Sequence, residues 1–231
     1  MNKTVLAIAA FLVAGLTSMV CADDAKKTTV VRGEKPKASP GWVVIEEEWW
    51  HPFLYDFSTT LHNAREHYRA KEEKFASAEI DKAISWLKYA QGDADKTTAE
   101  YLSTARHDLM DVSARLKSGK AVLAKDLDVA FAHASAALAN HHHFESAKAL
   151  AEGDLQTAGR HLMAAMDLLR SAAQTANVEY GSKVVDIYDA YAPYGYWDDT
   201  IVFEKNKLES NLSTVKAELE KLAAKLKART Y

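Results

Sequence analysis

The side chains best suited to chemistry in this sequence are its histidines. Nine are present in the 231 residues. Eight of these fall on four successive segments with helical periodicity: His62, His67, His107, His133, His141, His142, His143 and His161. Imidazole is the commonest neutral metal ligand in proteins and titrates near physiological pH. The histidines are therefore the first candidates for a functional site.

His141, His142 and Glu145 form the strongest candidate group. His141 falls in the middle of an apolar stripe, and Glu145 follows one turn later on the same side of the expected helix. A histidine and a carboxylate four residues apart on a helix can share one metal ion, so the pattern predicts a zinc, copper or nickel site flanked by His142. The alternative is a core histidine with a hydrogen-bonded partner and two solvated neighbours, in which case the cluster marks a bend in the helix.

Other chemistry receives less support from the sequence. His107 and His62 each share a helix face with acidic residues, and each face points away from its own apolar stripe, which predicts solvated surface groups. The chain carries no recognised motif for zinc hydrolases, di-iron carboxylates, covalent haem, serine hydrolases, phosphate loops or dinucleotides. A haem held between helices by His161 and Met163 or Met166 is a remaining alternative, although helical methionines usually fill cores.

The elements that would position these groups are amphipathic helices. Apolar residues recur at threes and fours from Leu54 to Tyr68, from Ala76 to Ala90, from Leu102 to Leu116 and from Leu155 to Ala172. An alanine-rich helix is expected from about Ala121 to Ala151. We expect turns near 71–74 and at 118–120, and expect glycine–aspartate pairs to end one helix and cap the next at 91–93 and 152–154. Four apolar positions beginning at Ala76 repeat 82 residues later, which indicates two similar helical hairpins.

The C-terminal region contains an aromatic segment followed by a regular helix. Between Tyr180 and Trp197, five tyrosines and one tryptophan accompany Pro193 and Gly195, which predicts a strap over one end of the core. A last helix, capped by Asp198 or Asp199, carries a heptad of apolar residues from Ile201 to Leu226. This helix either closes the protein's own bundle as a monomer, which is favoured, or pairs with a second copy.

The N-terminal region has the composition of an export signal. Lys3 precedes a short apolar run, and small residues end it at Ala22, so we expect a signal peptide at 1–22 and a mature chain from Asp23 in the bacterial periplasm or outside the cell. Lipidation at Cys21, the one cysteine, is the less favoured alternative. Residues 23–40 read as a disordered tether. Residues 41–231 read as one helical domain, which begins with an extended arm rich in tryptophan.

Charge excludes some classes of partner. The chain has 29 basic and 32 acidic side chains, and removal of Lys3 with the signal leaves 28 against 32, a net charge of −4. No basic stripe for nucleic acid and no second apolar run long enough to span a membrane is present. The partner is therefore expected to be a protein or a small ligand, and no membrane insertion is expected once the signal is removed.

Two similar stretches carry a family resemblance. Ala90-Gln91-Gly92-Asp93 and Ala151-Glu152-Gly153-Asp154 each lie inside a long amphipathic hairpin of an exported chain. Residues 75–177 in this respect resemble the YfdX-type periplasmic proteins. The resemblance implies an all-α fold, a periplasmic location and a link to bacterial stress responses, and it implies no catalytic residue.

The sequence therefore predicts an all-α bundle of five to six helices. The expected function is that of an exported, non-catalytic binding or envelope-stress accessory protein. A periplasmic protein that binds a divalent metal near His141 is the first alternative, and an enzyme with an unrecognised site is the second.

Overall fold

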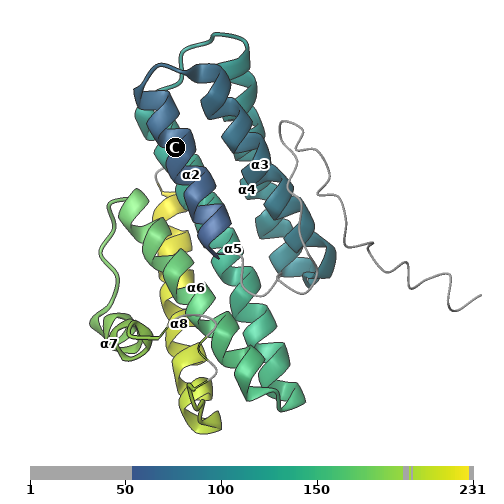
Figure 1. The fold of residues 1–231 in the computed structure, drawn as a ribbon, viewed down its shortest axis with the longest axis vertical. Helices are drawn as coiled ribbons and strands as arrows, with labels where there is room; N and C mark the ends of the chain where they lie inside the picture. The colour runs from purple at the N-terminus through teal and green to yellow at the C-terminus, as the bar shows by residue number, and fades with distance from the viewer. Residues whose placement is uncertain (1–53, 195–197, 199, 229–231) are drawn as a thin grey trace, which may run out of the picture. The chain divides into compact units, whose positions relative to one another are not determined.

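The computed structural model describes residues 54–194, 198 and 200–228. In these residues the chain forms seven α-helices and no β-strand (Figure 1). The helices are α2 (Leu54–Arg69), α3 (Glu73–Asp93), α4 (Lys96–Lys117), α5 (Ala124–Glu152), α6 (Leu155–Thr175), α7 (Ser182–Tyr191) and α8 (Lys205–Lys227). The all-α prediction is confirmed. The expected signal peptide, tether and tryptophan-rich arm lie outside the described residues.

Helix α5 is the central element. It is the longest described helix, with 29 residues, and it contacts α2, α3, α4, α6 and α8. Figure 1 shows α2, α3 and α4 around its first half and α6 and α8 around its second half. Its small alanine side chains, buried on several sides, allow the neighbouring helices to approach closely. The alanine-rich helix expected from the sequence is thus confirmed, with a start at Ala124 rather than near Ala121.

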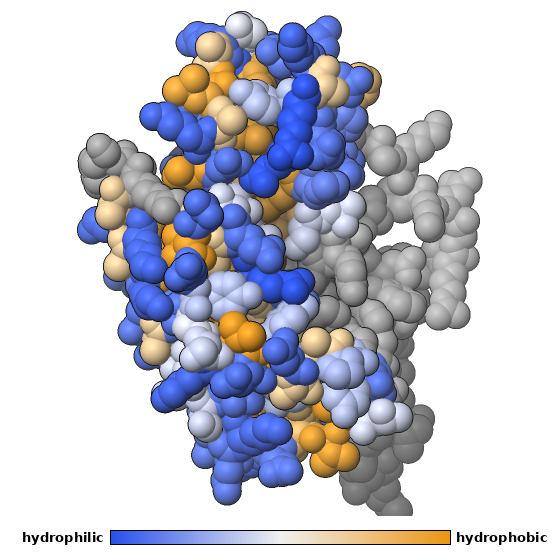
Figure 2. Space-filling model, turned by 90° about the vertical axis from the view of Figure 1, so that its left-hand side faces the viewer, coloured by the Kyte–Doolittle hydropathy of each residue, from blue (hydrophilic) through white to orange (hydrophobic). Residues whose placement is uncertain are grey.

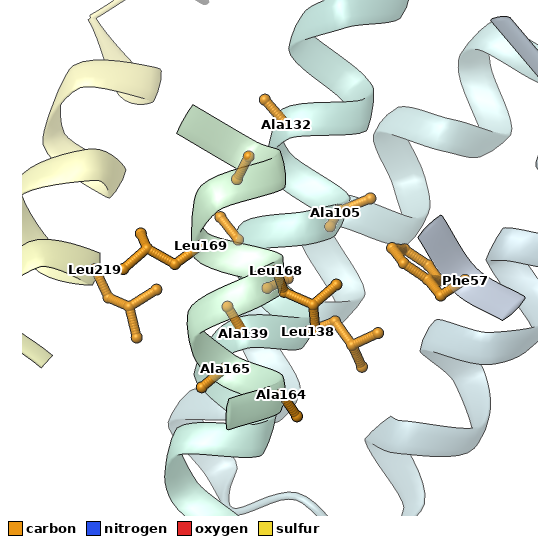
Figure 3. Packing of buried hydrophobic residues seen from close by; sticks show 14 of the residues in the cluster. Phe57, Ala105, Ala132, Leu138, Ala139, Ala164, Ala165, Leu168, Leu169 and Leu219 are labelled. Atoms are coloured by element: carbon orange, nitrogen blue, oxygen red, sulfur yellow. The ribbon is translucent and has the colours of Figure 1, made fainter. Parts of the chain in front are cut away.

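The core is built from leucines and alanines of different helices. Leu138 and Ala139 of α5 pack with Leu168 and Leu169 of α6, while Leu219 of α8 approaches from the other side (Figure 3). All five side chains are buried. Burial of apolar area of this kind is the main favourable term in folding.

The predicted turns are largely confirmed, with one correction. Gly153 adopts φ +84°, a left-handed conformation that suits glycine, and ends α5. Asp154 caps α6 by accepting a hydrogen bond from the Thr157 N–H at 3.0 Å. The first glycine–aspartate pair behaves differently, because α3 continues through Gly92 to Asp93, and Asp95 caps α4 through the Thr98 N–H at 2.7 Å.

The internal repeat is visible in the helix boundaries. Helix α3 covers 73–93 and α6 covers 155–175, so both have 21 residues and both ends are offset by 82. Each follows a helix with which it forms a hairpin, α2 before α3 and α5 before α6. These matching bounds agree with the 82-residue repeat in the sequence.

The aromatic segment contains a helix that the sequence analysis did not predict. Ser182–Tyr191 forms α7, which brings the described helices to seven instead of five or six. It packs on α6 and α8, with the Arg170 guanidinium 4.3 Å from the centroid of the Tyr188 ring. At its end, Asn211 Nδ2 donates to the Tyr191 hydroxyl at 3.3 Å. Residues 182–191 of this segment therefore form a short packed helix.

The last helix starts later than predicted. Helix α8 begins at Lys205, preceded by Glu204, and neither Asp198 nor Asp199 is its cap. Ile201 and Phe203 are buried, but they lie in the non-helical segment before α8, and Gln156 Nε2 donates to the Ile201 carbonyl at 2.8 Å. The apolar heptad is therefore helical only from Leu208 onward.

The seam of α8 is covered by the protein's own helices. Its apolar residues are buried against α5 and α6: Leu208, Leu212, Val215, Leu219, Leu222 and Leu226. Closure of the bundle by α8 is therefore present in the single chain, and a monomeric state stays a prediction. Figure 2 shows one face of the protein, on which hydrophilic residues predominate and hydrophobic ones form small separate groups.

Candidate functional site

Three consecutive histidines of α5 point toward different neighbours. Successive helical residues are separated by about 100° around the axis, so His141, His142 and His143 cannot share one face. His141 and His142 are each 1% exposed, whereas His143 is half-buried. Both can be buried because α5 is packed on several sides. The expectation that the neighbours of His141 are solvated is therefore wrong for His142.

His142 meets a histidine of the next helix. Its Nδ1 lies 2.9 Å from Nδ1 of His161 on α6, and the ring centroids are 5.1 Å apart. His161 is 2% exposed, so the contact lies in the interior. A hydrogen bond between two ring nitrogens requires one to donate and the other to accept. The two rings therefore tie α5 to α6 through a single proton.

A second polar contact lies further along the same interface. The Ser146 hydroxyl, one turn after His142, donates to the Ala158 carbonyl at 2.6 Å. The ring of His141 also contacts the ring of His142, with centroids 5.5 Å apart. Three imidazoles and one hydroxyl thus form a polar group inside a core that is otherwise built from alanine and leucine.

His143 ties α5 to the C-terminal helix. Its Nε2 donates to the Leu212 carbonyl of α8 at 3.0 Å, because a carbonyl oxygen can only accept. Burial lowers the pKa of His143 below its ordinary value, and the positive charge of Lys216 acts in the same direction, while the bond to Leu212 and the charge of Glu220 oppose the shift. The neutral ring is therefore favoured in the folded protein.

Glu145 lies in a poorly solvated position near the end of α3. Burial raises its pKa above the ordinary value, with Lys148 opposing the shift and Asp93 adding to it. One of its oxygens, Oε2, lies 3.5 Å from the Lys148 ammonium, and the other, Oε1, is buried without a hydrogen-bond partner. The ionised carboxylate is thus destabilised at this position.

His142 and Glu145, two of the predicted metal ligands, contact other side chains of the protein. In residues 54–194, 198 and 200–228, no three histidine, cysteine, aspartate or glutamate side chains come together in a way that could hold a metal ion. The observed partner of His142 is His161, which the metal hypothesis did not include. The structure does not test metal binding by His141, His142 and Glu145, which stays a prediction.

Four more histidines of the described residues lie at or near the surface. His62 and His107 are exposed, as the helical angles predict. His133 of α5 contacts the Asp108 carboxylate of α4 at 2.7 Å, and His67 contacts Glu72 at 2.6 Å across the turn between α2 and α3. Each of these contacts joins neighbouring parts of the bundle.

Sequence reasoning missed the partnership of His142 with His161, although a signal was available. Gly153 ends α5, and the two histidines lie eleven residues before it and eight residues after it. Two helices that fold back at a tight turn bring such positions to nearly the same level. Met163 and Met166, the alternative haem ligands, are buried in the hydrophobic core beside His161.

A shallow, open groove lies between the start of α7 and the middle of α8. It is lined by Gly181, Ser182, Lys183, Val184, Ser213, Thr214, Ala217 and Glu218. A Cβ added at Gly181 would lie 3.1 Å from Glu218 Oε2, and the Glu218 carboxylate pairs with Lys221 at 2.9 Å. The groove is separate from the histidines, so the buried polar group is the better candidate for a specific role.

No helix in the described part of the chain is long and apolar enough to cross a membrane. No protein-family model matches the chain, and the comparisons with curated proteins and with solved structures found no match.

Proposed function

We propose that the chain is an exported, non-catalytic helical protein of the bacterial envelope. It acts as an accessory protein in the response to envelope stress, by binding a protein or a small ligand. Export is supported by the composition of residues 1–22, where a charged residue precedes a short apolar run and small residues. The stress role is supported by the resemblance of residues 75–177 to YfdX-type periplasmic proteins.

The observation that carries the non-catalytic role is the use of the histidines as ties between helices. His142 contacts His161 of α6, His143 contacts the Leu212 carbonyl of α8, and His133 contacts Asp108 of α4. A general base must reach its substrate and exchange a proton during each cycle. A histidine that links two helices would loosen the bundle in doing so, which favours a structural role for these side chains.

The test is a dose response in a bacterium that carries this chain. Deletion of the gene should lower survival under envelope stress, such as acid or detergent, and graded expression of the exported wild type should restore survival in proportion to the amount of protein. A binding protein acts stoichiometrically, whereas an enzyme turns over at typically 1–10³ s⁻¹. Full recovery at about one hundredth of the normal level, or recovery by a chain that lacks residues 1–22, would contradict the proposal.

A further inference from the structure

One end of the helical bundle brings exposed apolar side chains together with lysines. Helices α2 and α4 end here, α3 and α5 begin here, and Figure 1 shows the two turns that join them at the same end of the bundle. The Tyr68 hydroxyl in the last turn of α2 donates to the Val122 carbonyl of the α4–α5 turn at 2.7 Å, which holds the two turns together. We call residues 69–76 and 117–127 the basic tip.

The basic tip is positively charged in a chain that is negative overall. It contains six basic and three acidic side chains, a net charge of +3, whereas the whole chain has a net charge of −3. Two of the acidic side chains already have partners: Glu72 lies 2.6 Å from His67, and Asp126 lies 3.1 Å from Arg115. The positive charge of the tip is therefore only weakly neutralised by its own carboxylates.

Most of the basic side chains of the tip form no ion pair. Lys117 pairs with Asp81 at 2.6 Å, and Arg69 pairs with Glu66 at 2.8 Å. The other four basic residues are exposed and form no ion pair within the described residues: Lys71, Lys74, Lys120 and Lys125. These four ammonium groups are available to a partner.

The positions of three of these lysines do not favour the fold. Lys71 has φ +62°, in the left-handed region that favours glycine, and the equivalent turns after α4 and α5 hold Gly119 and Gly153. Lys74 and Lys125 are each the second residue of a helix, where the helix dipole disfavours a positive charge. Local stability therefore does not explain why lysine stands at these positions.

Two large apolar side chains project from the same tip. Phe75 is 63% exposed, and its ring centroid lies 5.4 Å from that of His67. Leu123 is 55% exposed and directly follows the buried Val122, whose carbonyl accepts the hydrogen bond from Tyr68. His67 and Tyr68 are consecutive residues, so Phe75 and the residue before Leu123 both contact the last turn of α2. Exposed apolar side chains among lysines are typical of surfaces that bind anionic membranes.

We propose that the basic tip docks on the surface of a membrane that contains anionic lipid. The four lysines contact the lipid phosphates, and Phe75 and Leu123 enter the boundary between the head groups and the acyl chains. Lysine is depleted in protein interfaces, in which arginine is enriched, and all four of these cations are lysines. A flexible ammonium also suits a fluid anionic surface better than a fixed bidentate site. The proposal goes beyond the proposed function and does not depend on export.

The experiment measures binding of the mature chain to vesicles of phosphatidylcholine with about one third phosphatidylglycerol, by co-sedimentation at about 0.1 M salt. The tip variant combines Lys71→Gln, Lys74→Gln, Lys120→Gln and Lys125→Gln. The control variant removes four exposed lysines outside the tip that form no ion pair within the described residues: Lys88→Gln, Lys96→Gln, Lys205→Gln and Lys227→Gln. Both variants lose the same charge, and both keep residues 23–53, so any contribution of that segment to binding is common to them.

The tip variant should bind these vesicles at least about a hundredfold more weakly than the wild type, because each lysine near an anionic surface contributes about fivefold. The control variant should stay within about threefold of the wild type. Equal losses in the two variants would overturn the proposal, because binding would then depend on net charge alone. So would a wild type that does not bind these vesicles, or one that binds vesicles of pure phosphatidylcholine equally well.

Two further variants separate docking on lipid from folding and from simple charge attraction. Phe75→Ser should weaken vesicle binding about tenfold, since the apolar contact with the membrane is lost, while Tyr101→Ser, at an exposed position of α4 outside the tip, should not change it. Lys71→Gly should weaken binding about fivefold and leave the fold at least as stable in urea, because glycine suits the left-handed position. Unchanged binding of Phe75→Ser would indicate an acidic partner held by charge alone and would overturn docking on lipid, and unchanged binding of Lys71→Gly would overturn it as well.

Discussion

Replacement of Gly159 by alanine tests how the segment before α8 docks on α6. An ideal Cβ at Gly159 would lie 2.4 Å from three atoms of the Phe203 ring, Cδ1, Cε1 and Cζ. Phe203 is 5% exposed and also contacts the Tyr191 ring, with centroids 5.7 Å apart. The ring therefore has to move if a methyl group is added, and its movement disturbs the end of α7.

The expected magnitude is a difference between two opposing effects. Alanine in a helix interior is more stable than glycine by roughly 0.5–1 kcal/mol. Overpacking of a filled site costs typically about 1–3 kcal/mol. The free energy of unfolding of Gly159→Ala should therefore lie between no change and a loss of about 2.5 kcal/mol. Gly92→Ala is the matched control, because no atom lies within 4 Å of its added Cβ, and it should stabilise the protein by roughly 0.5–1 kcal/mol.

The assay is a double-mutant cycle by urea unfolding. With Phe203→Ala as the background, Gly159→Ala should recover the favourable helix effect, which gives a coupling free energy of about 1–3 kcal/mol between the two positions. If Gly159→Ala stabilises the otherwise unchanged protein as much as Gly92→Ala does, Phe203 does not pack on Gly159 and the docking of this segment on α6 is refuted.

Three further predictions concern α8, the α6 cap and processing. Leu219→Ala should lower the free energy of unfolding by about 2–5 kcal/mol through lost burial and a cavity. Sedimentation over a hundredfold concentration range should show a monomer for both the wild type and the variant. A wild-type dimer that dissociates on substitution would contradict closure by α8. Asp154→Ala should lower the free energy of unfolding by about 0.5–2 kcal/mol at pH 7 in chemical unfolding. Hydrogen bonds from Thr157 lower the pKa of Asp154, so this stabilisation is present above the ordinary pKa and disappears as the pH falls through the lowered value. A cost of the substitution that stays constant down to about pH 2 would contradict the cap. The intact mass of the exported protein should begin at Asp23 without lipid, and a lipidated Cys21 at the first position would contradict the predicted cleavage.

The sequence predicted the helices best where local signals decide. Gly153 and Asp154 combine a left-handed position with a capping carboxylate, and both act as expected because each depends on residues within one turn. At Gly92 the predicted helix end was wrong, because glycine is tolerated within a helix and α3 continues to Asp93. The residue that caps the next helix is Asp95. Helix α7 was missed because the segment was interpreted from its many aromatic residues. Its apolar residues do have helical spacing: Val184, Ile187, Tyr188 and Tyr191.

The sequence predicted where the candidate site lies on α5, but it did not predict which residues of other helices contact it. A single apolar stripe assigned a buried side to His141, yet α5 is covered on several sides, so the stripe could not show that His142 is buried as well. The meeting of His142 with His161 depends on how α5 and α6 pack after the turn at Gly153, which is a tertiary property. The raised pKa of Glu145 is caused mainly by burial, and it also depends on the charge of Asp93, the last residue of α3, which lies far from Glu145 in the sequence.

The most direct test of the account is nitrogen NMR of the wild-type protein labelled with ¹⁵N at histidine, at pH 7.5. If His142 and His161 share a proton between α5 and α6, one of the two Nδ1 atoms carries hydrogen and the other does not, and a scalar coupling is observed across the hydrogen bond between them. Two rings that both carry hydrogen only on Nε2, with no coupling between their Nδ1 atoms, would contradict the tie between α5 and α6 on which the proposed role of the histidines rests.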